Sequence, residues 1–163
     1  MTGGRIREGR RSDLPALRAI QAAVLAEPWE ELLAVAADGP PLLLVATPGQ
    51  SARTGVMDGA GTDTGAATPV GYALAVVDGD DAAYLAELAV APDAQGDGHG
   101  SALLEALVDR LHASGARELR VTVREVDERA RAFYRVRGFE RRDRLVDRYE
   151  RGDGFLLVRA IAD

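Results

Sequence analysis

The sequence contains no cysteine, no lysine and no asparagine, so all 20 of its basic residues are arginine. The absence of cysteine excludes disulfides, thiolate metal sites and a cysteine nucleophile. The absence of lysine excludes a Walker A phosphate loop, which needs that side chain beside the phosphates. Histidine occurs only as His99 and His112. We therefore expect no zinc site built on a histidine cluster, and no metal cofactor.

The sequence also has fewer basic than acidic residues. Its 26 acidic residues outnumber its 20 arginines, so the net charge is −6. This balance argues against a nucleic-acid-binding protein and suits a cationic partner. No apolar run reaches the roughly eighteen residues of a membrane span. The first residues also lack the apolar core of a signal peptide, so we expect no membrane association and a cytoplasmic location. The length of 163 residues predicts a single domain over 1–163.

Hydrophobic periodicity predicts both helices and strands. The expected helices cover 14–25, 29–37, 99–113 and 127–136. The expected strands cover 5–8, 42–45, 70–77, 83–90, 119–124, 139–149 and 155–161. Ser12 or Asp13 is expected to cap the first helix, and Asp127 the last. The strand–helix–strand run over 83–124 predicts a right-handed parallel unit, and the remaining strands are expected to pair antiparallel.

Residues 47–69 are rich in Gly, Ala, Thr, Ser and Asp and show no periodicity. Loops longer than about 12–15 residues are uncommon in compact domains. We therefore predict a hairpin loop that is lengthened by a flexible insertion. Two interpretations stay open, a disordered spacer without a role and a lid over a substrate.

Residues 87–100 combine a short apolar strand, a proline and a glycine-dense loop that opens a helix, ending in Gln95-Gly96-Asp97-Gly98-His99-Gly100. Such a loop turns several backbone N–H groups toward one point, where the positive end of the helix dipole favours a phosphate. The dinucleotide fingerprint Gly-x-Gly-x-x-Gly would need a glycine where Ser101 stands. The remaining alternative is a flexible turn without a ligand.

Further along, the chain reads Ala130-Arg131-Ala132-Phe133-Tyr134-Arg135-Val136-Arg137-Gly138-Phe139. The two segments, in this order, resemble the acyl-CoA-binding motifs of the GCN5-related N-acetyltransferase (GNAT) family. This resemblance implies an α/β (α+β) fold. In that fold a mixed, mostly antiparallel sheet of six to seven strands carries one parallel β-α-β unit and helices on both faces. It also implies acetyl-CoA as cosubstrate and a primary amine as acceptor.

The resemblance also implies which residues bind the cosubstrate. Backbone groups of the loop would hold the pyrophosphate, and the strand before it and the second motif would hold the pantetheine arm. These residues are Leu88, Ala89, Val90, Gln95, Gly96, Asp97, Gly98, His99, Gly100, Ser101, Asp127, Ala130, Phe133 and Tyr134. Asp97 and His99 depart from the family pattern, where a basic and an aliphatic residue are usual. Asp127 replaces the usual Asn and cannot donate an amide hydrogen bond.

Amide formation from a thioester needs a neutral amine, an oxyanion donor and a proton for the leaving thiolate. On the family template, the Val90 N–H polarises the carbonyl and Tyr134 protonates the sulfur. Glu87, on the central strand, is the candidate general base, with a substrate-orienting carboxylate or a solvated strand residue as alternatives.

The ending around Tyr149 and Gly152-Asp153-Gly154 is similar to that of the branch that acetylates the N-terminal alanine of a ribosomal protein. It favours a peptide or protein α-amine, with small cationic amines as the alternative. Small members of the family often form homodimers, so the resemblance also allows a homodimer. The competing hypothesis is a catalytically silent acyl-CoA-binding sensor.

Overall fold

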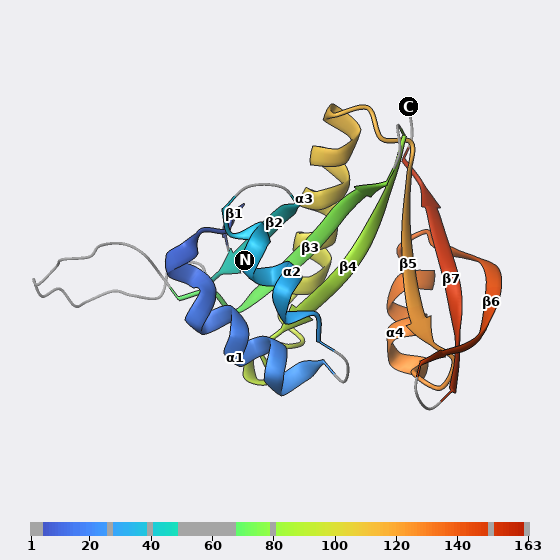
Figure 1. The fold of residues 1–163 in the computed structure, drawn as a ribbon, viewed down its shortest axis with the longest axis horizontal. Helices are drawn as coiled ribbons and strands as arrows, with labels where there is room; N and C mark the ends of the chain where they lie inside the picture. The colour runs from blue at the N-terminus through green and yellow to red at the C-terminus, as the bar shows by residue number, and fades with distance from the viewer. Residues whose placement is uncertain are drawn as a thin grey trace, which may run out of the picture. The chain divides into compact units, whose positions relative to one another are not determined.

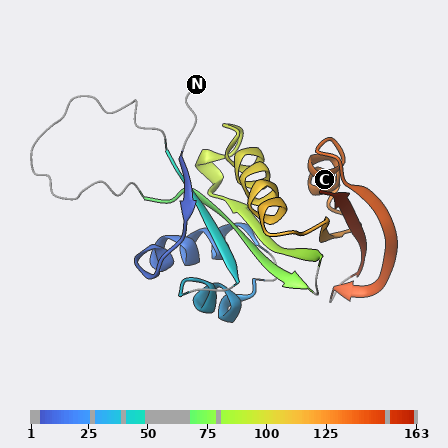
Figure 2. The ribbon, with the colours of Figure 1, turned by 90° about the horizontal axis from the view of Figure 1, so that it is seen from above.

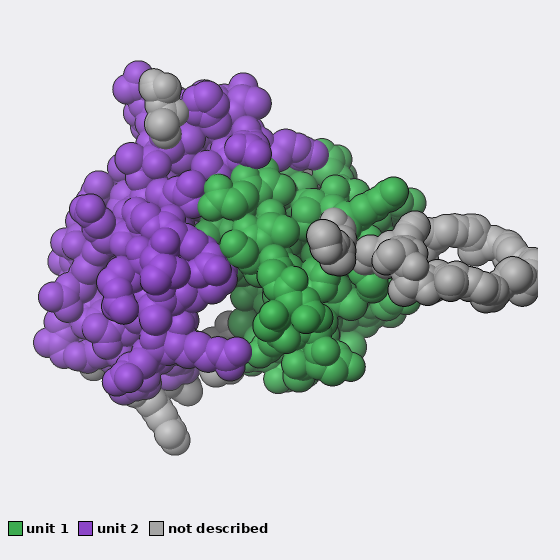
Figure 3. Space-filling model, turned by 180° about the vertical axis from the view of Figure 1, so that it is seen from behind, with its two compact units in different colours: residues 1–74, 87–107 green, residues 75–86, 108–163 purple. Residues whose placement is uncertain are grey.

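The computed structural model describes residues 5–25, 28–38, 41–48, 68–78, 81–149 and 152–161. The chain divides into two compact units, coloured separately in Figure 3. Unit 1 comprises Met1–Leu74 and Glu87–Leu107, and unit 2 comprises Ala75–Ala86 and Val108–Asp163. Most of the predicted insertion over 47–69 lies outside the described residues, and the single domain expected from the chain length stays a prediction.

Within the described ranges, the chain forms seven strands, four α-helices and short 3-10 turns (Figure 1). The strands are β1 (Arg5–Glu8), β2 (Leu42–Thr47), β3 (Gly71–Asp78), β4 (Ala82–Val90), β5 (Glu118–Arg124), β6 (Glu140–Tyr149) and β7 (Gly152–Ala160). The helices are α1 (Leu14–Val24), α2 (Glu30–Ala36), α3 (His99–Ala113) and α4 (Glu128–Arg135). The 3-10 turns are η1 (Arg11–Asp13) and η3 (Pro92–Ala94). All elements predicted from the periodicity are present.

The strands hydrogen-bond in the order β1-β2-β3-β4-β5-β7-β6. Strands β4 and β5 pair parallel through Ala82–Leu85 and Glu118–Val121, with α3 as the connection. Strand β1 pairs antiparallel with β2, and β7 pairs antiparallel with both β5 and β6. The predicted α+β class, with one parallel unit in a mostly antiparallel sheet, is therefore confirmed.

In unit 1, helices α1 and α2 lie on one side of the strands and the beginning of α3 lies on the other (Figure 2). Leu17 and Ile20 of α1 and Leu33 of α2 are buried, as their helical spacing predicts. On the α3 side the packing is close, because a Cβ on Gly71 would lie 3.0 Å from the Ala89 carbonyl oxygen and 3.3 Å from Leu103 Cδ1. The glycine therefore lets β3, β4 and α3 approach one another.

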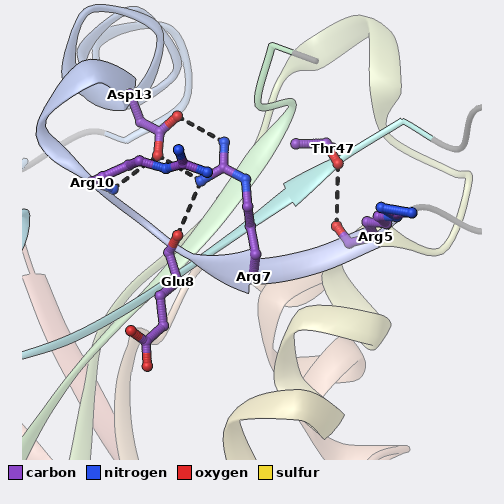
Figure 4. Close-up of polar contacts among 6 residues, drawn as sticks. All are labelled: Arg5, Arg7, Glu8, Arg10, Asp13 and Thr47. Carbon is purple, nitrogen blue, oxygen red and sulfur yellow. Dashed lines mark hydrogen bonds and ion pairs between the residues drawn. The ribbon is translucent and has the colours of Figure 1, made fainter. Parts of the chain in front are cut away.

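The start of α1 differs from the prediction, because Asp13 makes no side-chain hydrogen bond to that helix. Its carboxylate instead accepts two hydrogen bonds from Arg7, at 2.8 and 2.9 Å, and one from the Arg10 N–H at 2.9 Å (Figure 4). Asp13 is 5% exposed. Its carboxylate oxygens accept from Arg7 of β1 and from the Arg10 N–H, and not from the N–H groups of α1 that a helix cap would bind. The contact fastens η1 to β1.

In unit 2, β5 alternates buried and half-buried residues and pairs with β7 along its whole length. The Asp127 carboxylate accepts a 3.0 Å hydrogen bond from the Ala130 N–H, which confirms the predicted cap of α4. The predicted start of the last strand at residue 155 is wrong, because β7 begins at Gly152. Gly152 already pairs with Tyr149, so the glycines at 152 and 154 belong to the strand and not to its turn.

Candidate active site

One side chain of the loop that follows β4 hydrogen-bonds back to the last residue of that strand. After η3, the Gln95 side chain donates a 2.9 Å hydrogen bond from Nε2 back to the Val90 carbonyl. The Ala91 N–H donates to the Val70 carbonyl at 2.8 Å, so the end of β4 is also tied to the residue before β3. These contacts fix where the loop leaves the sheet and where α3 begins.

The turn into α3 uses two glycines with positive φ, 89° at Gly96 and 90° at Gly98. Neither has an atom within 4 Å of where a Cβ would lie, so backbone conformation and not space favours glycine here. The first α3 hydrogen bond runs from the Ala102 N–H to the Gly98 carbonyl at 3.0 Å. The N–H groups of the first helical turn precede that bond and have no intrahelical carbonyl, which is the geometry that favours an anion.

The side chains of this loop face largely outward. Asp97 is exposed, whereas His99 and Gly100 at the start of α3 are half-buried, as is Ser101. A carboxylate at an anion site is unfavourable, and its exposure lets water screen that charge. Of the two residues that depart from the family pattern, Asp97 lies on the surface of the loop and His99 is the first residue of α3.

The strand that leads into the loop has one buried and one half-exposed face. Leu88 and Val90 are half-buried, whereas Ala89 is 2% exposed. The parallel pairing of β4 with β5 ends at Leu85. Beyond that pair, Leu88 and Val90 lie on the face opposite Glu87 and Ala89, as the alternation predicts.

Glu87 is buried, with 6% of its surface exposed, and its carboxylate accepts three hydrogen bonds. Oε1 accepts from Gln21 Nε2 at 2.9 Å and from the Tyr72 hydroxyl at 2.8 Å. Oε2 accepts from the backbone N–H of Trp29 at 2.6 Å. The alternative of a solvated strand residue is therefore wrong, because Glu87 joins β4 to α1, β3 and the residue before α2.

This arrangement limits the chemistry of the carboxylate. Each carboxylate oxygen accepts about two hydrogen bonds, so Oε1 is fully used and Oε2 has one acceptor position left. Burial first, and then the charge and hydrogen bond of Glu87, raise the pKa of the Tyr72 hydroxyl well above its ordinary value. Tyr72 therefore stays protonated and acts as a hydrogen-bond donor to Glu87. The general-base role of Glu87 stays a prediction.

Sequence reasoning missed Gln21 and Tyr72 as partners of Glu87. Both are at most 2% exposed. Gln21 follows Leu17 by one helical turn, so it is a polar residue on the apolar face of α1. A buried amide and a carboxylate on the buried face of a strand each need a partner. That requirement is the signal from which their contact could have been predicted.

The residues of the second motif lie in unit 2. Tyr134 is 7% exposed, and its ring makes edge-on contacts with Phe133 and Phe139, both at 5.1 Å between centroids. The Arg137 guanidinium lies 3.9 Å from the Phe133 ring centroid. Gly138, at a φ of 95°, ends the helical segment before Phe139. Helix α4 thus holds the Tyr134 ring in a fixed aromatic cluster.

Across the described residues, no group of three or more His, Cys, Asp or Glu side chains is arranged to hold a metal ion. None of the helices in the same ranges is both long and apolar enough to cross a membrane.

The chain matches the model of the acetyltransferase (GNAT) family over residues 26–139. The chain belongs to this family and is an acyltransferase. The match covers the α2 region, the glycine loop and the second motif as far as Phe139. No curated protein matches the chain.

Several solved structures share the fold of this chain. Ard1 from Thermoplasma volcanium superposes with a TM-score of 0.82 at 21% identity, covering 99% of both chains. The ribosomal-protein-S18-alanine N-acetyltransferase from Escherichia coli superposes with a TM-score of 0.77 at 28% identity, covering 98% of this chain and 95% of the other. Arabidopsis thaliana Naa50, in complex with the bisubstrate analogue CoA-Ac-MVNAL, gives 0.75 at 18% identity, covering 96% and 98%.

Proposed function

We propose that the protein transfers an acetyl group from acetyl-CoA to a primary amine, by direct attack while both substrates are bound. The observation that carries this proposal is the loop between β4 and α3. There, two glycines with φ near +90° lead into the first turn of a 15-residue helix, whose N–H groups have the geometry that favours an anion. A pyrophosphate is the group of acetyl-CoA that such a site would hold.

The cosubstrate would be held mainly by backbone groups. The loop Gln95–Ser101 binds the pyrophosphate, and the pantetheine arm pairs with Leu88–Val90 as an added strand would. The half-exposed side chains of Leu88 and Val90, beyond the segment that pairs with β5, support that placement. In the second motif, Asp127, Ala130 and Phe133 are the proposed pantetheine contacts. Asp127 already accepts from the Ala130 N–H, so its contribution there is to shape the start of α4.

The proposed reaction forms one bond and breaks one. The neutral amine nitrogen attacks the thioester carbonyl carbon, the Val90 N–H stabilises the oxyanion, and the carbon–sulfur bond then breaks. Tyr134 gives its hydroxyl proton to the departing thiolate, the proton that the new amide nitrogen loses passes to solvent water, and the Tyr134 phenolate regains a proton from water. The packing of the Tyr134 ring against Phe133 and Phe139 supports this role, because a fixed ring positions its hydroxyl.

The proposed acceptor is the α-amine of a peptide or protein, and small cationic amines are the alternative. The support for a peptide is the likeness, at 28% identity, to the ribosomal-protein-S18-alanine N-acetyltransferase from Escherichia coli. The net charge of −6 suits either acceptor, because both are cationic before they lose a proton.

A second candidate function is an acyl-CoA sensor that transfers nothing. Two observations favour it. Asp97 places a carboxylate in the phosphate loop, and the Asp127 side chain lacks the amide donor that the family pattern supplies.

The test is release of free thiol from acetyl-CoA in the presence of N-terminal peptides, lysine peptides, polyamines or aminoglycosides. The chain has no cysteine, so its own thiols give no background. Thiol release that depends on a peptide with a free α-amine, and not on its N-blocked control, is the expected result. Tight acetyl-CoA binding without thiol release from any acceptor would favour the sensor.

A further inference from the structure

The Glu87 carboxylate is surrounded by neutral donors that come from three parts of unit 1. Gln21 lies on α1, Tyr72 on β3, and Trp29 directly before α2. The Trp29 N–H bond is the shortest of the three, at 2.6 Å. Hydrogen bonds to an ionised acceptor are about twice as strong as neutral ones. The three hydrogen bonds to Glu87, which we call the Glu87 tie, therefore hold these parts of unit 1 together strongly.

We propose that Glu87 is a positioning residue, which holds the chain at Trp29 and α1 against β4, and is not the proton acceptor. The inference rests on the proposed function for its effect on rate. Glu87 lies three residues before Val90, in the strand proposed to hold the thioester. The tie therefore holds that part of β4 at a fixed position relative to α1 and the start of α2. A proton acceptor needs an accessible lone pair, and three donors occupy three of the about four acceptor positions of this carboxylate, which is 6% exposed.

Trp29 is the point at which the tie acts on the backbone. Its N–H donates to Glu87, and its own carbonyl accepts the N–H of Leu33 at 3.3 Å as α2 begins. The Trp29 side chain is 50% exposed, so the buried partner of this residue is its backbone N–H and not its ring. Loss of the acceptor at Glu87 would release the start of α2.

The chain supplies its own reporter, because Trp29 is its single tryptophan. In Glu87→Gln a single amide carbonyl replaces the two carboxylate oxygens, so the three donors compete for it and the Trp29 bond is weakened. We therefore expect this variant to lower the steady-state fluorescence anisotropy of Trp29 and to increase its quenching by acrylamide. Glu31→Gln is the matched control, because it makes the same change at an exposed position of α2 and should leave both readings unchanged. These measurements need no substrate, so they test the tie even if no acceptor is found.

The exchanged pair Gln21→Glu with Glu87→Gln is the decisive variant. The amide carbonyl at position 87 can still accept the Trp29 N–H, while its NH₂ takes the place of Oε1 and donates to the carboxylate now at position 21. The Tyr72 hydroxyl, which already contacts Gln21, donates to that carboxylate in place of Oε1. The charge and the tie are therefore kept, and the carboxylate at position 87 is removed. We expect wild-type anisotropy and recovery of most of the acetyl-transfer rate.

Rate measurements separate the two roles of Glu87. For Glu87→Gln we expect kcat/KM to fall roughly tenfold, which corresponds to about 1.4 kcal/mol, because buried donors are left without an acceptor. The shape of the pH profile should be unchanged. The proposal is overturned if Glu87→Gln removes the acidic limb of that profile while Trp29 keeps its anisotropy. It is also overturned if the exchanged pair holds Trp29 yet stays inactive, and this variant decides alone if Glu87→Gln does not fold.

Discussion

The hydroxyl of Tyr72 donates a 2.8 Å hydrogen bond to Oε1 of Glu87, and the two residues are 0% and 6% exposed. Tyr72→Phe would keep the packing of the ring and remove the hydroxyl, with its hydrogen bonds to Glu87 and Gln21. A hydrogen bond to a charged group contributes about 1.5–3 kcal/mol, so we expect the free energy of unfolding to fall by that amount. Urea unfolding at neutral pH, followed by circular dichroism, measures it. A loss near zero would show that the contact is weak in solution.

The same contact gives the stability a dependence on alkaline pH. Burial and the neighbouring Glu87 raise the pKa of Tyr72 in the folded protein. The folded protein therefore holds this proton more tightly than the unfolded chain does. Its contribution to stability is complete below the unfolded pKa of about 10 and is lost as pH rises above that value. The alkaline loss of stability should be smaller in Tyr72→Phe than in the wild type, and equal losses would contradict the assignment.

The ion pair between Arg7 and Asp13 should make a measurable contribution to stability. Asp13→Asn keeps the volume of the side chain and loses the charge, and we expect it to lower the free energy of unfolding by about 1–3 kcal/mol. Asp38→Asn is the matched control, because the Asp38 pair with Arg11 spans 3.6 Å between side chains that are 57% and 73% exposed. Exposed pairs contribute about 0–1 kcal/mol, so the control should change little. Equal losses of stability in the two variants would show that the buried ion pair contributes no more than the exposed one.

The pH dependence of this pair has the opposite sign to that of Tyr72. Burial alone would raise the pKa of Asp13, but the hydrogen bonds from Arg7 and the Arg10 N–H outweigh it and lower the pKa. The stabilisation is therefore present above the unfolded pKa of about 3.9 and is lost as pH falls through the lower folded value. Acid unfolding of Asp13→Asn should show a shallower slope in that window than the wild type.

Gly98 and Gly115 offer a matched pair for a test of the glycine loop Gln95–Ser101 as the proposed pyrophosphate site. Their φ values are 90° and 96°, and neither has an atom within 4 Å of where a Cβ would lie, so alanine meets the same backbone strain at both. We expect each alanine to cost about 1–2 kcal/mol of stability. Only Gly98→Ala should also weaken acetyl-CoA binding, because only Gly98 lies at the proposed pyrophosphate site. Isothermal titration measures that binding, and an unchanged affinity in Gly98→Ala would show that the loop is not the site.

Local signals in the sequence were enough for much of the fold. The Asp127 cap was predictable, because its acceptor and the Ala130 N–H are three residues apart in one helical turn. The Asp13 cap was not, because Arg7 from the preceding strand competes for the same carboxylate. Periodicity placed the strands but misplaced the start of β7, where Gly152 pairs with Tyr149 although glycine is typical of turns.

The candidate site was only partly predictable for a related reason. The glycine loop and the second motif are contiguous in sequence, so their residue types could be recognised directly. The partners of Glu87 are distant, and Gln21 lies 66 residues before it. Alternation placed Glu87 on one face of its strand, but no local pattern specified whether helices or solvent would cover that face. The hydrogen bonds that restrict its chemistry therefore required the structure.

Tyr134→Phe tests whether the protein is an enzyme or a sensor. The phenylalanine would keep the edge-on contacts with Phe133 and Phe139, so the ring cluster should persist and the affinity for acetyl-CoA should change little. A positioned acid contributes about a hundredfold or more, and kcat should fall by that factor because the thiolate then leaves without its proton donor. Steady-state thiol release at saturating acetyl-CoA measures it. A variant that keeps full kcat would remove Tyr134 from the reaction, and weaker acetyl-CoA binding without a change in kcat would assign its hydroxyl to binding alone.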